Sequence, residues 1–284
     1  SGIDTTPVWI DSTVKLPTNA QGNDIQLRWR VATDNGTFRE GQYIDDITVT
    51  DGFVCDCVNQ TNNNAPFDFD GDGKTDLSIF RPSDNANDAD FYIQQSSDAA
   101  NTGAAWGSSG DVAVNEDYDG DGKTDLAVFR PTTRTWFILN SSNNLFTAVN
   151  FGLPQDKLTP ADFDGDNKAD IAVYRQAEGL WYVLQSSNAQ VRIQQWGIAE
   201  DLPVQEDFDG DGKADLAVFR PTTGVWYALQ SSDNGFSAFQ FGLNGDKPVV
   251  GDFDADGKAD FVVYRPSERI WYLFKTTEGF GAVQ

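Results

Sequence analysis

The chain has 284 residues, of which 44 are acidic and 20 basic, so its formal net charge is −24. This charge excludes a general affinity for nucleic-acid phosphates or anionic lipid. No apolar run of about 18 residues exists, so no membrane insertion is predicted. The chain contains no histidine, which excludes His-based triads, bases and zinc ligands. It also lacks methionine and a signal peptide, so we expect a processed product or a fragment.

Residues 1–52 are predicted to form a small β-sandwich-like segment. Val8–Leu16, Ile25–Val31 and Ile44–Val49 are typical of strands, and the second alternates strictly between apolar and polar residues. The stretch Gly41–Ile47 resembles the end of MAM-like or jelly-roll domains found beside secreted peptidases. The resemblance implies the C-terminal part of such a domain. Either its first half is missing or its open edge pairs with another chain.

Residues 53–64 are predicted to be a linker that carries Cys55 and Cys57, the only two cysteines. In a secreted protein both are expected to be oxidised. A direct bond would be strained, because residues two apart on a strand point the same way. Bonds to other chains or to a missing segment are the alternative. A C-x-C metal site has no further Cys or His in the sequence to complete it.

An internal repeat dominates residues 65–284. An acidic loop of the pattern D-x-D-x-D-G-x-x-D occurs five times, with starts 49, 45, 45 and 45 residues apart. The loops span residues 68–76, 117–125, 162–170, 207–215 and 252–260.

Each loop is followed by an apolar run ending in Arg, a turn, an aromatic strand, a Ser-Ser or Thr-Thr turn, and a last strand. In four repeats that last strand ends in Phe-Gly or Trp-Gly. Strand 1 precedes the loop, as in Pro248–Phe253, so the loop joins strands 1 and 2. Four short strands in about 45 residues is the size of a propeller blade. We therefore predict an all-β fold, a β-propeller of five four-stranded repeats preceded by the sandwich-like segment.

The acidic loops have the ligand pattern of calcium sites. Carboxylates at positions 1, 3, 5 and 9 and the backbone carbonyl of Lys at position 7 supply oxygen ligands, which calcium prefers. Magnesium fits less well, because it keeps several waters and requires a tighter octahedron. Position 6 is Gly or, once, Asn167, and both tolerate a left-handed conformation. The first six positions resemble an EF-hand loop. About five Ca²⁺ ions are predicted, one per repeat, with the ligand residues Asp68, Asp70, Asp72, Lys74, Asp76, Asp117, Asp119, Asp121, Lys123, Asp125, Asp162, Asp164, Asp166, Lys168, Asp170, Asp207, Asp209, Asp211, Lys213, Asp215, Asp252, Asp254, Asp256, Lys258 and Asp260.

The plain alternative is that each loop is a solvated turn, but five loops at fixed spacing argue against it, since their carboxylates would otherwise repel one another. We expect a structural role for the metal. The alternative is an open coordination position for a ligand carboxylate or a sugar hydroxyl.

Over residues 62–284 the loops and Phe-Gly pairs resemble FG-GAP/VCBS-type repeats, as in integrin α-subunit propellers and secreted bacterial proteins. The resemblance implies a calcium-binding β-propeller outside the cell that serves adhesion or ligand recognition. Departures are Asn167 and Ala255 in place of Gly, and no Phe-Gly after Gln284. Integrin-type propellers have seven blades, so the five repeats form a closed ring, a truncated ring, or an open stack completed by a neighbour.

The Arg that ends each strand 2 suggests either a ring that meets an acidic ligand, or five structural residues that pair with Asp or stack on the strand-3 Trp. These residues are Arg81, Arg130, Arg175, Arg220 and Arg265. The strand-3 Trp-aromatic pairs are likewise expected to pack the blades rather than to hold sugars.

No catalytic constellation emerges, so a non-enzymatic protein is predicted, secreted or attached to the cell surface. The leading function is adhesion or ligand binding, with a protein or glycan partner and no nucleic acid. One alternative is a structural subunit that polymerises with copies of itself into an extracellular filament through the N-terminal β segment. Another is the C-terminal accessory region of a larger secreted hydrolase.

Overall fold

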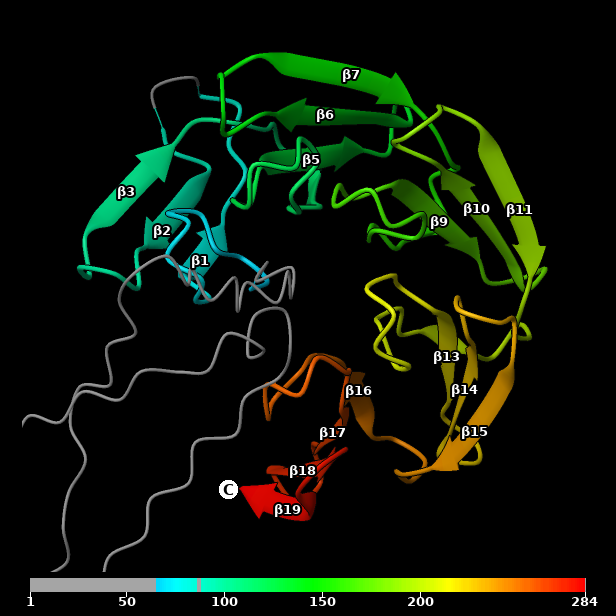
Figure 1. The fold of residues 1–284 in the computed structure, drawn as a ribbon. Helices are drawn as coiled ribbons and strands as arrows, with labels where there is room; N and C mark the ends of the chain where they lie inside the picture. The colour runs from blue at the N-terminus through cyan, green and yellow to red at the C-terminus, as the bar shows by residue number, and fades with distance from the viewer. Residues whose placement is uncertain (1–64, 86–87, 284) are drawn as a thin grey trace, which may run out of the picture. The chain divides into compact units, whose positions relative to one another are not determined.

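The computed structural model describes residues 65–85 and 88–283 (Figure 1). The chain divides into two units, residues 1–59 and 60–284. The predicted β-sandwich-like segment (1–52) and the linker with Cys55 and Cys57 lie outside the described residues, so they stay predictions. The described part contains strands and no α-helix, and therefore no helix that could cross a membrane.

The described strands form five antiparallel sheets, which we number blades 1 to 5 in chain order. In each sheet the strand order follows the sequence, so no strand is exchanged between blades. The blades are blade 1 (β1 Leu77–Phe80, β2 Phe91–Gln94, β3 Asn101–Ala104), blade 2 (β4 Val112–Ala113, β5 Leu126–Arg130, β6 Thr135–Leu139, β7 Phe146–Asn150), blade 3 (β8 Lys157–Leu158, β9 Ile171–Arg175, β10 Leu180–Leu184, β11 Val191–Gln195), blade 4 (β12 Leu202–Pro203, β13 Leu216–Arg220, β14 Val225–Leu229, β15 Phe236–Gln240) and blade 5 (β16 Lys247–Val249, β17 Phe261–Arg265, β18 Ile270–Lys275, β19 Gly279–Val283).

The predicted all-β propeller of five repeats is confirmed, and blades 2 to 5 have four strands each. Blade 1 has three strands among the described residues. Strand limits were wrong in strand 1 of blade 5 and in the last strand of blades 1 to 4, which ends before the Phe-Gly or Trp-Gly pair. Strand 1 of blade 5 ends at Val249 rather than Phe253. In blade 2, strand 4 ends before Phe151-Gly152, because the Phe151 carbonyl accepts the Trp136 indole N–H at 3.1 Å and Gly152 has a left-handed φ of 84°.

Burial decreases from the second strand of a blade to the fourth. In blade 3, the first four residues of β9 are all buried, whereas β11 alternates between exposed and half-buried residues. Strands covered on both faces favour continuous apolar runs, and strands covered on one face favour alternation. This explains why the Leu-Ala-Val-Phe type of sequence marks strand 2.

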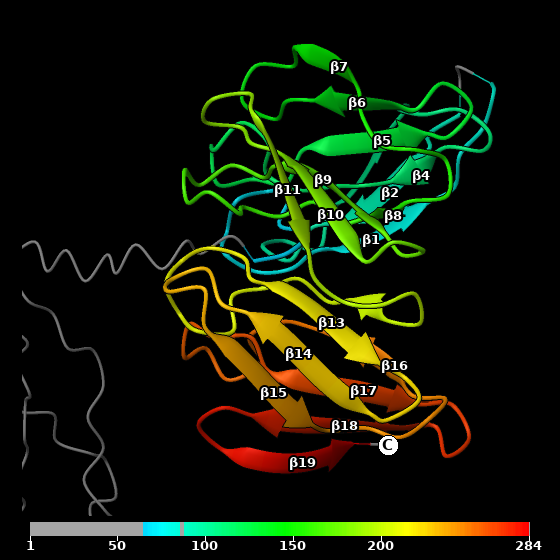
Figure 2. The same cartoon turned by 90° about the vertical axis from the view of Figure 1, so that its right-hand side faces the viewer.

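Consecutive blades lie side by side (Figures 1 and 2), and the buried clusters between them consist mainly of residues of their second and third strands. Between blades 3 and 4, Trp181 and Val183 lie in one buried cluster with Leu216 and Val218. Corresponding residues form the clusters at the other three junctions between consecutive blades. The core of the propeller is therefore a series of equivalent junctions. In each junction, aromatic residues of one blade pack against aliphatic residues of the next blade.

Candidate metal centres

In blades 2 to 5 the acidic loop lies in the hairpin between strands 1 and 2, as predicted, and in blade 1 the loop directly precedes β1. In blade 2 the loop lies between β4 and β5, and backbone N–H groups of the loop donate hydrogen bonds to the carboxylate of its first Asp. Position 6 has a left-handed φ in every loop, from 65° at Asn167 to 84° at Gly212. The left-handed conformation predicted there, which Gly and Asn tolerate, is confirmed.

The first and ninth Asp residues organise the loop. In blade 2, Asp117 accepts hydrogen bonds from the N–H groups of Gly120 and Gly122 at 2.6 and 2.8 Å. Asp125 accepts one from Tyr118 at 2.9 Å and one from Ser141 at 2.7 Å. These bonds hold both carboxylates in fixed positions before any ion arrives, which favours tight coordination.

The Asp at position 3 supplies a buried oxygen without a hydrogen-bond partner in three of the five loops. In the other two, Asp70 Oδ1 and Asp209 Oδ1 accept the N–H of the Asp at position 5. The Oδ1 atoms of Asp119, Asp164 and Asp254 are buried and accept no hydrogen bond. A buried carboxylate oxygen without a partner costs free energy, and a bound cation removes that cost. The donor set therefore fits a metal ion. In every loop, oxygens of positions 1, 3 and 9 lie within 4.8 Å of one another, in the groups Asp68/Asp70/Asp76, Asp117/Asp119/Asp125, Asp162/Asp164/Asp170, Asp207/Asp209/Asp215 and Asp252/Asp254/Asp260.

The Asp at position 5 is turned toward the Ser-Ser turn, a role that sequence reasoning missed. Asp121 Oδ1 accepts the Lys123 N–H and the Ser141 hydroxyl, both at 2.9 Å. The hydroxyl of Ser142 donates to Asp119 Oδ2 at 2.6 Å. The signal was available, because a pair of hydroxyl residues recurs in all five repeats, as Ser-Ser in four and as Thr276-Thr277 in the fifth. That position 5 and the position-7 carbonyl are ligands stays a prediction.

Replacing Ser142 with Ala is expected to weaken calcium binding by the blade 2 loop about tenfold, because outer-shell partners of this kind orient the ligands they contact. Ser142→Thr is the matched control and is expected to bind normally, since Thr277 occupies the equivalent place in blade 5. Calorimetric calcium titration of both variants checks this. Equal affinities would contradict an orienting role for the hydroxyl.

Burial raises the pKa of three ninth-position carboxyls, those of Asp125, Asp170 and Asp215, to about 6. Their pKa values in the unfolded chain are lower, so between about pH 4 and 6 the folded, calcium-free protein binds more protons than the unfolded chain. Its stability therefore falls as pH rises through this window.

We expect opposite pH trends with and without calcium. Calcium-stripped protein should melt at a higher temperature at pH 5 than at pH 7. In millimolar calcium the stabilisation by the ion should shrink as pH falls below about 6, since protons compete for the same carboxylates. Melting curves across this range, with and without calcium, check it. Two curves that run parallel would contradict the assignment of these carboxyls to the metal centres.

The loops of consecutive blades are joined along one edge of the propeller. The N–H of position 8 donates to the carbonyl of position 1 in the preceding loop, at 2.7 Å in all four junctions. The Lys at position 7 lies against Gly at position 4 of that preceding loop; a Cβ built on Gly71 would be 2.8 Å from Lys123 Cε. The Lys side chain thus packs between loops.

The Arg residues that end the apolar runs of strand 2 form ion pairs or ring contacts with other residues of the propeller. Four of them donate through Nε and Nη2 to both oxygens of an Asp that precedes the loop, as Arg220 does with Asp201 at 2.8 and 2.9 Å. Their partners Asp111, Asp156, Asp201 and Asp246 recur every 45 residues, a signal the sequence analysis missed. Stacking also occurs, but on the residue after the Trp: Arg265 lies 4.3 Å from the Tyr272 ring.

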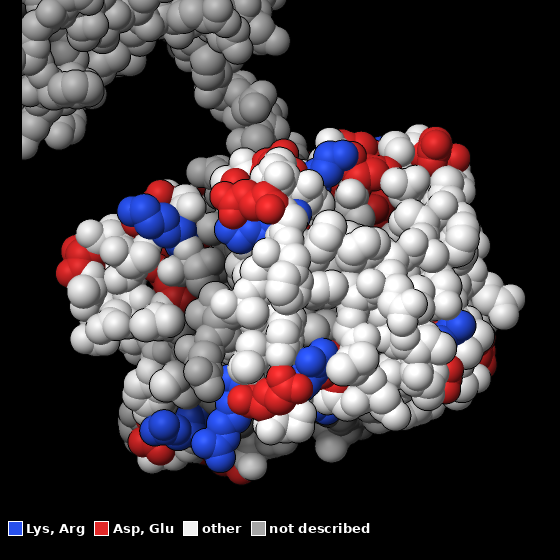
Figure 3. Space-filling model, turned by 90° about the horizontal axis from the view of Figure 1, so that it is seen from below, with Lys and Arg blue, Asp and Glu red and all other residues white. Residues whose placement is uncertain are grey.

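Charged side chains of both signs lie around the rim of the face in Figure 3, and a broad uncharged surface lies between them. The strand-3 residues Trp136, Trp181 and Trp226 are buried, and each indole N–H donates to a backbone carbonyl. They pack the blades, as expected.

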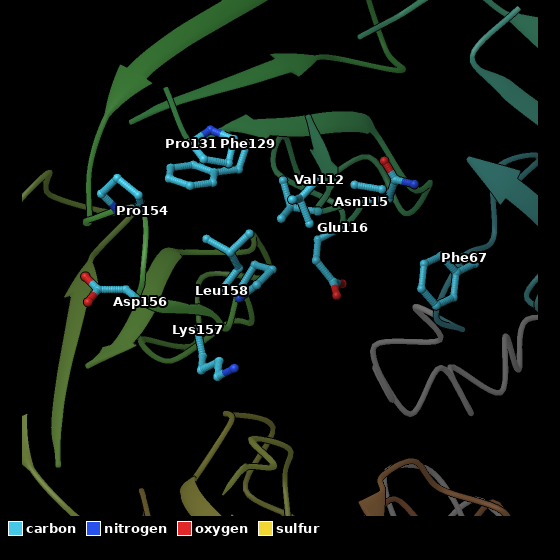
Figure 4. A pocket seen from close by; sticks show the side chains of 13 residues that line it. Phe67, Val112, Asn115, Glu116, Phe129, Pro131, Pro154, Asp156, Lys157 and Leu158 are labelled. Atoms are coloured by element: carbon cyan, nitrogen blue, oxygen red, sulfur yellow. The ribbon is translucent and has the colours of Figure 1, made fainter. Parts of the chain in front are cut away.

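A cavity of about 540 Å³ lies beside the first strands of blades 2 and 3. Its lining is mostly apolar and includes Val112 and Leu158, and Figure 4 shows the Glu116 carboxylate pointing into the space between Phe67 and Leu158. Burial, together with the charge of Glu206, raises the pKa of Glu116 to about 8. Concave, mainly apolar sites with a few polar groups are typical of small ligand-binding sites.

The family comparison agrees with this geometry. Residues 117–173 and 207–263 match the family model described as FG-GAP-like repeat. Each match begins at the first Asp of a loop and ends inside strand 2 of the next blade. The chain is thus an all-β five-bladed propeller, and two segments of it, each running from the acidic loop of one blade into the next blade, match the FG-GAP-like repeat model. No curated protein matches the sequence.

Several solved structures resemble the chain at low identity. A streptogramin B lyase has 10% identity and a TM-score of 0.46, with 68% of this chain and 61% of that chain covered. A catalytically inactive virginiamycin B lyase from Staphylococcus aureus with quinupristin has 9% identity and a TM-score of 0.45, covering 68% and 62%. A putative 6-phosphogluconolactonase from Bacteroides fragilis has 14% identity and a TM-score of 0.40, covering 68% and 63%. The chain therefore spans about three fifths of the length of these proteins, and no function is transferred from them.

Proposed function

We propose that the protein is a secreted, non-enzymatic β-propeller that is stabilised by calcium and binds a protein or glycan ligand at a cell surface. The observation that carries the calcium part is the recurrence of three-carboxylate groups in all five loops, with a buried, unpartnered oxygen in three of them. FG-GAP-like repeats support an extracellular, ligand-binding role.

The metal acts structurally in this proposal. The loops hold their carboxylates together through backbone N–H groups and the Ser-Ser turns, and calcium neutralises the charge so gathered. Oxygen-rich coordination fixes the hairpin between strands 1 and 2 and, through the hydrogen bonds between loops, the order of the blades. Ligand binding would then use a surface that calcium keeps in shape, and the cavity lined by Val112 and Leu158 is the concave candidate.

Labelled full-length chain applied to a glycan array and to a panel of purified extracellular-matrix proteins tests the binding part. We expect binding in millimolar calcium, loss of binding after chelation, and loss in the Val112→Arg variant, which fills the cavity. Val191→Arg is the matched control, because Val191 is similarly exposed on the outer strand β11 (49%, against 45% for Val112). Equal binding by both variants would reject the cavity, and no binding to any probe would reject the proposed function.

A further inference from the structure

The outermost faces of blades 1 and 5 are uncovered among the described residues. Ile79 is 56% exposed, whereas its counterparts Val128, Val173, Val218 and Val263 are at most 1% exposed. Trp271 is 41% exposed, whereas Phe91, Trp136, Trp181 and Trp226 at the same position are at most 2% exposed. The apolar pattern of the blade junctions therefore continues on two faces that no blade of the described residues covers.

These two faces are the two halves of one junction. Blade 5 presents an aromatic face, defined here as Phe253, Tyr264, Trp271 and Leu273. Blade 1 presents an aliphatic face, defined here as Thr75, Leu77 and Ile79. The aromatic faces of blades 1 to 4 each pack on the aliphatic face of the next blade.

Blades 4 and 5 illustrate the match. Phe219 and Trp226 from the aromatic face of blade 4 form a buried cluster with Val263 of blade 5. Tyr264 and Trp271 occupy the places of Phe219 and Trp226, and Ile79 occupies the place of Val263. A contact between the aromatic face of blade 5 and the aliphatic face of blade 1 would therefore repeat an interface that this chain already makes four times.

The series of hydrogen bonds between consecutive acidic loops also ends in a donor on blade 1 and an acceptor on blade 5. At the four junctions the position-8 N–H donates to the position-1 carbonyl of the preceding loop. The carbonyl of Asp252 and the N–H of Thr75 are the outer ends of this series, and Thr75 is exposed while Thr124, Ala169 and Ala259 at the same position are buried. One position differs: Ala255 stands where the other loops have Gly, so Lys74 would have to bend away from it, which a flexible side chain can do.

We propose that the aromatic face of blade 5 docks on the aliphatic face of blade 1 of a second copy of this chain. The contact is head-to-tail, because two different surfaces meet, so it propagates into a ring or a filament according to the rotation between copies. Central aromatic and aliphatic residues of such a junction carry most of its binding energy. The inference is independent of the proposed ligand and uses no residue of the N-terminal segment.

Two variants of the full chain, each with one face blocked, test the contact. Ile79→Asp blocks the aliphatic face and Trp271→Asp blocks the aromatic face. Light scattering on a sizing column in millimolar calcium should give assemblies for the wild type and particles near 31.2 kDa for each variant alone. An equimolar mixture of the two variants should give a particle of twice that mass and nothing larger, because one intact face of each kind remains. Each substitution is expected to raise the dissociation constant about 30-fold or more.

Ile193→Asp is the matched control, since Ile193 is 57% exposed on the outer strand β11, and it should assemble as the wild type does. Leu77→Asp repeats the test at a side chain that is 71% exposed, where a folding defect is not expected. Melting curves in calcium verify that each variant is folded. A monomeric wild type, variants that still assemble, or a mixture that stays monomeric would each overturn the proposal.

Discussion

Removing calcium is expected to lower the melting temperature of the full chain by about 20 °C or more. A site kept at 100 times its dissociation constant adds about 2.7 kcal/mol to stability. For a domain of this size each kcal/mol corresponds to about 2–4 °C. Five sites act together, because the loops of consecutive blades are hydrogen-bonded to one another. Calorimetry in millimolar calcium and after chelation measures the difference.

Magnesium is the control for this experiment. It demands a tight octahedron and retains its waters, so it should restore little of the lost stability at the same concentration. A melting temperature that is unchanged by the chelator, or restored equally by both ions, would contradict the calcium assignment.

Replacing Asp170 with Asn is expected to remove one calcium ion and about 3 kcal/mol of stability in calcium, while changing the calcium-free protein by about 1 kcal/mol or less. Asp170 is fully buried, accepts the N–H groups of Phe163 and Ser186, and shares its metal group with Asp162 and Asp164. Asn preserves the shape but loses the charge and one acceptor. Denaturant unfolding in both conditions measures the two values.

Asp233→Asn is the matched control, because Asp233 is an exposed turn residue outside the acidic loops whose carboxylate accepts the N–H of Gly235. Its stability should stay within about 0.5 kcal/mol of the wild type in both conditions. If Asp170→Asn cost the same amount with and without calcium, the residue would be a structural cap rather than a ligand.

Local chemistry explains what the sequence could predict. The limits of β5, β9, β13 and β17 agree with the apolar runs that end in Arg, because strands covered on both faces allow few other residues. The left-handed backbone at position 6 follows from Gly and Asn. The grouping of the Asp residues at positions 1, 3 and 9 follows from the repeated spacing.

The remaining features depend on contacts between segments far apart in sequence. Ser142 meets Asp119 across 23 residues, and Arg220 meets Asp201 across 19, so neither pair follows from a local pattern. The Arg side chains stack on the residue after the Trp because successive side chains of a strand point to opposite faces. The exposure of the outer faces of blades 1 and 5 could not be predicted from the sequence, because it depends on which blades pack against one another in the structure.

The number of calcium ions bound to the folded full chain tests the central claim most directly. Protein equilibrated in calcium, freed of unbound ion by desalting and analysed by elemental mass spectrometry, is expected to carry five ions per chain, one for each carboxylate group. Circular dichroism on the same sample confirms that it is folded. Folded protein that retains no calcium, with no binding detected by calorimetric titration, would contradict the claim.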